Sequence, residues 1–174
     1  MASLVVMGVS GCGKSLVGAA IARRLGRPLI EGGDFYSETN RDLMHQGIAL
    51  TDAQRADWLD RLGAELARHP ASAVLTCSTL KVSYRQRLRV ADRGLRFAWL
   101  DLEPDAAEAR VALRPAHFFP AVLVATEFEA LEPPLHEPGV LRVDALRASE
   151  VLAGCVERWM VDTSASGQPK EHTP

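Results

Sequence analysis

The feature that most constrains this chain is a glycine-rich segment at residues 8–15, which reads GVSGCGKS. The segment matches the pattern G-x-x-x-x-G-K-[ST] at every fixed position. An apolar run at residues 3–7 precedes it, and apolar residues at helical spacing follow it at 14–25. This context favours a strand, a phosphate-binding loop and a helix over an ordinary glycine turn. We therefore expect the loop to bind nucleotide phosphates through Gly8, Val9, Ser10, Gly11, Cys12, Gly13, Lys14 and Ser15.

Each part of this loop has a physical task. Glycines allow positive φ, so that successive N–H groups can curl around an anion. The helix that follows adds the positive end of its dipole. We expect Lys14 to act as a catalytic residue that reaches the β- and γ-phosphates of ATP, and Ser15 to hold Mg²⁺ through its hydroxyl. Cys12 is interpreted as a small side chain that the loop tolerates, and not as a reactive thiol.

The rest of the chain alternates apolar strands with amphipathic helices. Strands are predicted at residues 3–7, 28–30, 72–76, 95–102 and 140–143, and helices at 14–25, 38–46, 52–68, 81–91, 104–113 and 148–159. This alternation predicts a three-layer α/β fold, in which a parallel sheet of about five strands is covered by helices on both faces. Ligands of such sheets bind at the carboxyl ends of the strands. We expect one domain over residues 1–162, with a short lid near 110–120, and a disordered tail at 163–174.

Composition limits the partners of the chain. Of its 174 residues 47% are hydrophobic and 24% are charged, and the formal net charge is -2. This balance gives no reason to expect nucleic acid or an acidic membrane as a partner, and no apolar stretch reaches the length of a membrane span. The cysteines Cys12, Cys77 and Cys155 form no CxxC pair, which argues against a disulfide framework and a structural zinc site. We expect a cytoplasmic protein that binds a small molecule.

Missing motifs narrow the class of phosphate-loop protein. The sequence contains neither the N-K-x-D sequence that reads guanine nor the L-S-G-G-Q sequence of transporter ATPases. The chain is also short for a motor protein or a hexameric ATPase. A small kinase that acts on a metabolite or a nucleotide is the class that remains.

Four blocks of sequence point to one family of such kinases. They are MGVSGCGKS at 7–15, GGDFYSETNRDLMHQGIALTDAQRADWL at 32–59, TCSTLKVSYRQRLR at 76–89 and RVALRPAHFFPAVLVATEFEALEPP at 110–134. Many kinases share the first block, whereas the third and fourth are much more selective. On these blocks the chain resembles the small gluconokinases. The resemblance implies a P-loop kinase fold, ATP and Mg²⁺ as cofactors and D-gluconate as the phosphate acceptor, and it suggests a homodimer.

The resemblance also implies which residues act on the substrate. Asp34 follows the second strand, where its carboxylate can orient or deprotonate the acceptor hydroxyl, or hold Mg²⁺ through water. Arg55 is implied to bind the substrate, and a guanidinium suits the carboxylate of gluconate because two parallel N–H bonds fit its two oxygens. Lys81 and Arg85 are four residues apart on a predicted helix and would share one face of it. Both are expected to bind the substrate.

A lid is expected to close over the phosphates. Arg110 and Arg114 are also four residues apart, and they lead into the sequence PAHFF at 115–119. Arginines on such a lid stabilise the charge of the transferring phosphoryl group and help to exclude water. Arg110 is assigned to the nucleotide, Arg114 to catalysis and, on the resemblance, His117 to the substrate.

The sequence departs from the usual pattern of the family on the sugar side. Tyr36 stands where histidine is usual, Ala49 where proline is usual and Glu127 where glutamine is usual. The usual acidic pair before the aromatic residue is here Gly33-Asp34. Two alternatives therefore stay open. One is a kinase for another small polar metabolite, such as shikimate or a different sugar acid, and the other is a nucleotide-binding module without turnover.

Overall fold

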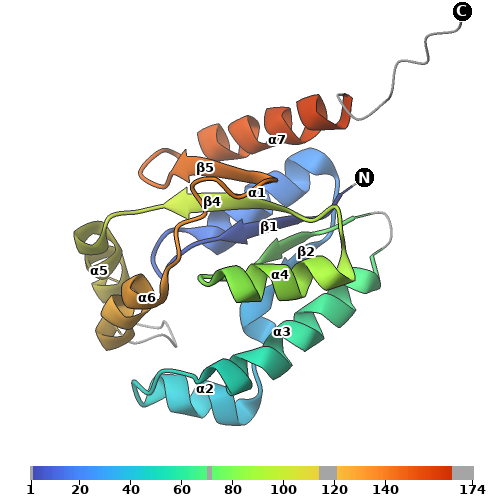
Figure 1. Ribbon diagram of the computed structural model, residues 1–174. Helices are drawn as coiled ribbons and strands as arrows, with labels where there is room; N and C mark the ends of the chain where they lie inside the picture. The colour runs from blue at the N-terminus through green and yellow to red at the C-terminus, as the bar shows by residue number, and fades with distance from the viewer. Residues whose placement is uncertain (1, 70–71, 114–120, 166–174) are drawn as a thin grey trace, which may run out of the picture.

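A five-stranded sheet forms the centre of the protein (Figure 1). The computed structural model describes residues 2–69, 72–113 and 121–165. Within these residues all strand pairs are parallel and the strand order is β2-β3-β1-β4-β5. The strands are β1 (Leu4–Met7), β2 (Leu29–Glu31), β3 (Val74–Thr76), β4 (Arg96–Asp101) and β5 (Val140–Asp144). The predicted α/β fold with a parallel sheet is confirmed.

Helices connect the strands in the predicted alternation. They are α1 (Lys14–Leu25), α2 (Glu38–His45), α3 (Asp52–Ala67), α4 (Val82–Ala91), α5 (Pro104–Ala112), α6 (Val124–Ala130) and α7 (Ser149–Ala165), with short 3-10 helices η1 (Gly32–Phe35) and η2 (Ala121–Leu123). Helix α6 and both 3-10 helices were not predicted. Over the described residues, none of these helices has the length and apolar character needed to cross a membrane.

The C-terminal helix differs from the prediction in its length. Helix α7 continues beyond residue 159, where we expected it to end, and its last described residue is Ala165. Residues 163–165 are thus helical and not part of a tail. The rest of the predicted tail, residues 166–174, lies outside the described residues, and the boundary of the domain at 162 stays a prediction.

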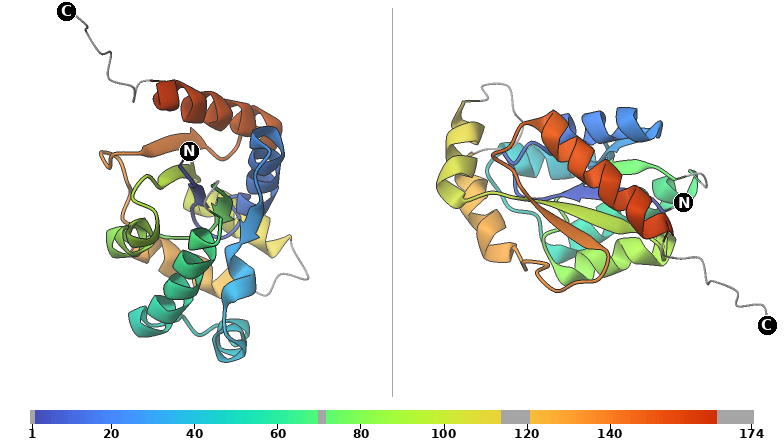
Figure 2. Two further views of the ribbon diagram at one scale, coloured as in Figure 1. Left: turned by 90° about the vertical axis from the view of Figure 1, so that its right-hand side faces the viewer. Right: turned by 90° about the horizontal axis from the view of Figure 1, so that it is seen from above.

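Strand β1 shows why the sequence of the sheet is continuously apolar. Its neighbours are β3 and β4, with Val5 opposite Leu75 on one side and Phe97 on the other. Leu4 and Val6 belong to one buried cluster with residues of α1 and α7. Val5 and Met7 belong to a second cluster with residues of α3 and α4. Both faces of the strand are therefore buried, as in other parallel sheets, and the predicted three layers are confirmed (Figures 1 and 2).

Caps fix where the helices near the carboxyl edge begin. Helix α3 starts with a capping box, in which Thr51 Oγ1 accepts a hydrogen bond from Gln54 N (3.3 Å) and Gln54 Oε1 accepts one from Thr51 N (2.9 Å). Helix α2 starts at Ser37, whose Oγ accepts a hydrogen bond from Asn40 N (3.1 Å). Because the cap sets the start of α3, it also sets the position of the first turn, which carries Arg55.

The carboxyl edge of the sheet gathers the segments that the sequence marked as functional. Strand β1 leads into the loop 8–13, β2 into η1, and β3 into the segment 77–81. Helices α5 and α6 contact each other beyond the end of β4 (Figure 1). Segments far apart in the sequence thereby meet at the edge where parallel sheets bind their ligands.

Candidate active site

The loop between β1 and α1 needs its glycines for space as well as for conformation. Gly8 has φ of 144°, and a Cβ there would lie 2.8 Å from both Cys12 Sγ and the carbonyl oxygen of Leu100. Gly11 has φ of 84°, and a Cβ there would lie 2.9 Å from the carbonyl oxygen of Ala107. Any larger residue would push the loop away from β4 and α5. The glycines therefore set the curled shape that phosphate binding requires.

The lysine of the loop folds back over this curl. Lys14 Nζ donates hydrogen bonds to the carbonyl oxygens of Gly8 and Val9, both at 3.0 Å. The ammonium group is thus held beside the loop whose N–H groups would bind phosphate. The side chain of Cys12, within the loop, is buried, and this burial raises the pKa of its thiol. A raised pKa leaves little thiolate, which fits the interpretation of Cys12 as a packing residue.

A cavity of about 380 Å³ opens beside the loop. Lys14 and Ser15 line it from the loop and α1, and the exposed Asp34 lines it from η1. Ser78 lines it from the segment after β3, and Glu127 from α6. The structure therefore brings Lys14, Ser15 and Asp34 to one cavity, as the sequence led us to expect.

A carboxylate that we did not predict, that of Glu31, also lines this cavity. Glu31 Oε2, at the end of β2, accepts hydrogen bonds from Ser15 Oγ (3.0 Å) and from Thr76 Oγ1 (2.5 Å). Carboxylate and hydroxyl oxygens are the ligands that Mg²⁺ prefers, and nucleotide kinases use few of them because phosphate oxygens complete the shell. This set of oxygens fits such an ion. The position of Glu31 at the end of a predicted parallel strand was the signal that could have revealed it.

A smaller cavity of about 90 Å³ also reaches the carboxyl edge. Arg55, Lys81 and Glu127 are among the residues that line it. The Lys81 ammonium donates to both carboxylate oxygens of Asp52 (2.8 and 3.1 Å), and the Tyr84 hydroxyl donates to the same carboxylate. These hydrogen bonds lower the pKa of Asp52, and the bond to Asp52 raises the pKa of Lys81. Lys81 is therefore already paired, and its charge is largely balanced.

An aromatic pair borders the larger cavity on the side of α3. The rings of Tyr36 and Trp58 are stacked, with centroids 4.4 Å apart and an angle of 13° between their planes. Trp58 Nε1 donates to the carbonyl oxygen of Gly32 (2.8 Å), which fixes η1 against α3. Burial raises the pKa of Tyr36, while Arg55 beside it acts in the opposite direction. The phenol thus stays neutral near the cation that we expect to bind the substrate.

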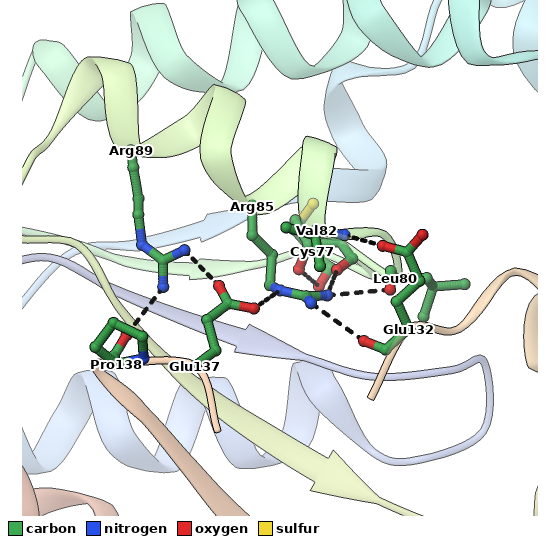
Figure 3. Close-up of polar contacts among 9 residues, drawn as sticks. Cys77, Leu80, Val82, Arg85, Arg89, Glu132, Glu137 and Pro138 are labelled. Carbon is green, nitrogen blue, oxygen red and sulfur yellow. Dashed lines mark hydrogen bonds and ion pairs between the residues drawn. The ribbon is translucent and has the colours of Figure 1, made fainter. Parts of the chain in front are cut away.

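Arg85 lines neither cavity. Figure 3 shows the protein groups that it contacts instead. Its side chain is completely buried, and its Nε donates to Glu137 Oε2 (2.8 Å). Nη1 donates to the carbonyl oxygens of Thr79 (2.9 Å) and Leu80 (3.0 Å), and Nη2 donates to that of Glu132 (3.1 Å). Every nitrogen of the guanidinium therefore has a protein acceptor. The predicted role of Arg85 in substrate binding needs correction, because four of its five N–H donors are already engaged and its completely buried side chain lines neither cavity.

The reason for this difference lies at the start of α4. Lys81 is the N-cap of the helix and has extended backbone angles, φ −94° and ψ 149°. The helical rule that places residues four apart on one face applies only when both are helical. Lys81 turns toward Asp52, whereas Arg85 turns toward the segment 132–137. Sequence spacing alone could not separate the two.

The predicted lid is described only at its start. Arg110, in the last turn of α5, donates to the carbonyl oxygens of Gly11 (3.4 Å) and Ala145 (3.1 Å). It therefore lies beside the phosphate loop, where the expected contact with nucleotide is feasible. Arg114 and His117 lie outside the described residues.

Glu127 is the second carboxylate that our site prediction did not include. It is only 5% exposed, and its Oε2 accepts a hydrogen bond from the N–H of Ser10 in the loop (2.6 Å). Burial raises the pKa of the Glu127 carboxyl, and the charge of Lys14 acts in the opposite direction. Glu127 lines both cavities. Its helix, α6, was not predicted, and the only signal in the sequence was a glutamate where glutamine is usual in the family.

A phosphate loop at the carboxyl edge of this parallel sheet places the chain among the P-loop nucleotide-binding proteins, and the absence of the N-K-x-D and L-S-G-G-Q motifs indicates a small kinase. The APS kinase of Mycobacterium tuberculosis shares the fold, with a TM-score of 0.67 at 20% identity over 92% of this chain and 98% of that one. A gluconokinase from Sinorhizobium meliloti is more similar, with a TM-score of 0.85 at 37% identity over 96% of this chain and 98% of that one. No family model matches the sequence.

A comparison of sequences gives the family. The thermosensitive gluconokinase of Escherichia coli is 39% identical over 146 residues, which are 82% of this chain and 78% of that protein. A gluconokinase of Gluconobacter oxydans is 40% identical over 153 residues, 86% of this chain and 85% of that protein. The chain belongs to the gluconokinase family.

Proposed function

We propose that this protein transfers the γ-phosphoryl group of ATP to a hydroxyl of D-gluconate, giving ADP and 6-phospho-D-gluconate. The observation that carries the proposal is the arrangement of the two cavities. The larger one holds the phosphate loop with Lys14 and the carboxylate of Asp34, and the smaller one holds the cations Arg55 and Lys81. A sugar acid needs both parts, one for its reacting hydroxyl and one for its carboxylate. Membership of the gluconokinase family supports this substrate.

The phosphates are bound by the loop in this proposal. Its N–H groups and Lys14 stabilise the negative charge that spreads over the γ-phosphoryl group as it moves. Arg110 adds a cation beside the loop, where it already contacts Gly11. The predicted lid residues Arg114 and His117 belong to the same proposal, Arg114 toward the phosphoryl group and His117 toward the substrate.

A magnesium ion fits oxygens that line the larger cavity. Ser15 and Glu31 would hold it, since Ser15 Oγ and Glu31 Oε2 lie within 3.0 Å of each other. When bound, Mg²⁺ neutralises charge on the β- and γ-phosphates. Asp34 faces the same cavity, where its carboxylate can orient the acceptor hydroxyl or a water of the ion.

The carboxylate of the sugar acid is assigned to Arg55. Its guanidinium offers two parallel N–H donors, which match the two oxygens of a carboxylate. Lys81 lines the same cavity and adds positive charge, although Asp52 already holds its ammonium. We infer that Arg55 makes the stronger contact of the two.

The cysteines bear on the compartment in which the protein works. Cys12, Cys77 and Cys155 are free thiols, which supports a reducing compartment such as the cytoplasm. The homodimer suggested by the family resemblance stays a prediction.

A substrate panel tests the proposed function. ADP release is followed with Mg-ATP and, in turn, D-gluconate, other sugar acids and shikimate, with Lys14→Ala as the inactive control. We expect turnover that depends on D-gluconate and is lost in the variant. Turnover with a different acid alone would refute gluconate as the substrate and direct attention to Tyr36. ATP binding without turnover on any acceptor would favour the nucleotide-binding module instead.

A further inference from the structure

The position of Glu127 between the two cavities is unusual for a carboxyl group. It comes from α6, it is buried, and it lines the large cavity with the phosphate loop as well as the small cavity with Arg55. Its hydrogen bond to the N–H of Ser10 fixes one carboxylate oxygen at the loop. A carboxylate has four acceptor positions on its two oxygens, so this bond leaves capacity for a further donor.

Two cations act on this carboxyl group, one from each of the cavities that it lines. The charges of Lys14, in the phosphate loop, and of Arg55, in the small cavity, both favour the ionised form of Glu127. In the proposed reaction Lys14 holds the phosphates and Arg55 holds the acid end of the substrate. The hydroxyl that receives the phosphoryl group has to lie between these two ends. Glu127 lines the wall along that path.

We propose that the Glu127 carboxylate accepts the proton of the substrate hydroxyl, an assignment that rests on the proposed kinase function. The hydroxyl oxygen forms a bond to the γ-phosphorus as its proton passes to Glu127. The bond between the γ-phosphorus and the bridging oxygen breaks, and its electron pair leaves with ADP. Glu127 then returns the proton to water after the products have left. A general base of this kind must lie within hydrogen-bond reach of the proton that it takes.

The other carboxylates of the cavity suit this task less well. Glu31 Oε2 already accepts from Ser15 and Thr76, and this position fits a metal ion. Asp34 is exposed, so water competes with the substrate for its oxygens.

The surroundings of Glu127 give this base a distinct pH dependence. Burial raises its pKa, whereas Lys14 from α1, Ser10 from the loop and Arg55 from α3 act in the opposite direction. Cys12 and Tyr36 also face it, and burial raises the pKa of both, so that they stay neutral. A protonated carboxyl cannot accept a proton. Activity should therefore fall as the pH drops through the raised pKa of Glu127.

The test compares Glu127→Gln with three matched variants. The glutamine keeps an acceptor for the Ser10 N–H but cannot take a proton, whereas Glu127→Ala removes both functions. Glu129→Gln makes the same chemical change at an exposed position of the same helix. Asp34→Asn removes the competing carboxylate. The turnover number and KM are measured against pH with Mg-ATP and the sugar acid that the wild type phosphorylates.

We expect Glu127→Gln and Glu127→Ala to lower the turnover number alike, by about a hundredfold or more, with KM little changed. The fall of activity on the acid side should disappear in Glu127→Gln and persist in Asp34→Asn. Glu129→Gln should behave as the wild type. Near-normal turnover in Glu127→Gln would overturn the assignment. If Glu127→Ala were slow at the same time, the result would show that only the hydrogen bond to Ser10 matters.

Three further outcomes each have a separate meaning. If Glu127→Gln does not fold, Glu127→Asp is measured in its place. The fall of its activity on the acid side should move to lower pH, because aspartate has a lower ordinary pKa than glutamate. An unchanged pH profile would overturn the proposal. If the wild type uses another acid in place of D-gluconate, the proposed substrate fails while the comparison at Glu127 is made with that acid. If the wild type phosphorylates no acceptor, there is no proton to take, and both proposals fall.

Discussion

Two groups of charged residues in this protein differ in what their charges face. Arg85 is enclosed, with Glu137 and three carbonyl oxygens as acceptors, and Arg89 pairs with the same Glu137 (Figure 3). Lys14 and Arg55 instead line open cavities. Both groups come from segments that resemble the same family. The difference teaches that access to a cavity, and not residue type, separates the residues that can touch a substrate from those that hold the site in place.

The enclosed group also explains how the site keeps its shape. Thr79 has a left-handed backbone with φ of 39°, an uncommon conformation for a residue with a side chain. The Arg85 guanidinium donates hydrogen bonds to the carbonyl oxygen of Thr79 and to that of the next residue, Leu80. It therefore braces the segment that carries Ser78 and Lys81 to the cavities.

The largest effect on activity is expected at Lys14, where a substitution should abolish function without lowering stability. Lys14→Ala should lower kcat/KM by at least about a thousandfold, because it removes a preorganised cation from the transferring phosphoryl group. Its midpoint of urea unfolding should stay near that of the wild type. Arg93→Ala removes a positive charge from an exposed turn before β4 and serves as the control, with unchanged kinetics. Full activity in Lys14→Ala would contradict the site.

The opposite pattern is expected at Arg85. Arg85→Met should lower the free energy of unfolding by about 3 kcal/mol, because it leaves carbonyl oxygens and the Glu137 carboxylate without their buried partner. Urea unfolding measures this change. Arg87→Met, at an exposed position of the same helix where Arg87 pairs with Asp60, should have no measurable effect. A stable Arg85→Met protein with a higher KM for gluconate would restore the substrate role that the structure argues against.

A smaller and more specific change is expected at Arg55. Arg55→Ala should raise KM for D-gluconate by about tenfold to a hundredfold, the range expected when a hydrogen bond to a charged group is lost. KM for ATP should change little, because Arg55 lines the small cavity away from the loop. Arg55→Lys should restore part of the affinity, since it keeps the charge but loses the planar pair of donors. A change confined to KM for ATP would show that Arg55 acts on the nucleotide and not on the sugar acid.

The smallest effect is expected at Lys81. Asp52 already pairs with its ammonium, so Lys81→Ala should raise KM for D-gluconate less than Arg55→Ala does. Steady-state kinetics of the two variants, measured side by side, give the ranking. An effect of Lys81→Ala that exceeds that of Arg55→Ala would reverse our assignment of the carboxylate.

The fold could be predicted from the sequence because its signals are local. The glycine loop, the apolar strands and the helical spacing each specify a nearby conformation, and their alternation leaves few topologies. Helix α6 was missed because it has only seven residues and follows the segment 110–120, which we read as a lid. The end of α7 was placed too early because polar residues at its end resemble a tail.

The site could be predicted only in part, for reasons of tertiary structure. The loop residues and Asp34 follow strands directly, so their place at the carboxyl edge was foreseeable. Arg85 was misassigned because its acceptors, Glu132 and Glu137, lie about fifty residues away in sequence. Glu127 joins the loop through a hydrogen bond that spans 117 positions. No local pattern reports such contacts.

The most direct test of the account follows the phosphorus itself. The wild type is incubated with Mg-ATP and D-gluconate, and ³¹P NMR records where the γ-phosphorus goes, with Lys14→Ala as the control. Our account predicts the signals of ADP and of a phosphate monoester on the primary hydroxyl of gluconate, both absent in the control. ADP with inorganic phosphate alone, or unchanged ATP, would contradict it.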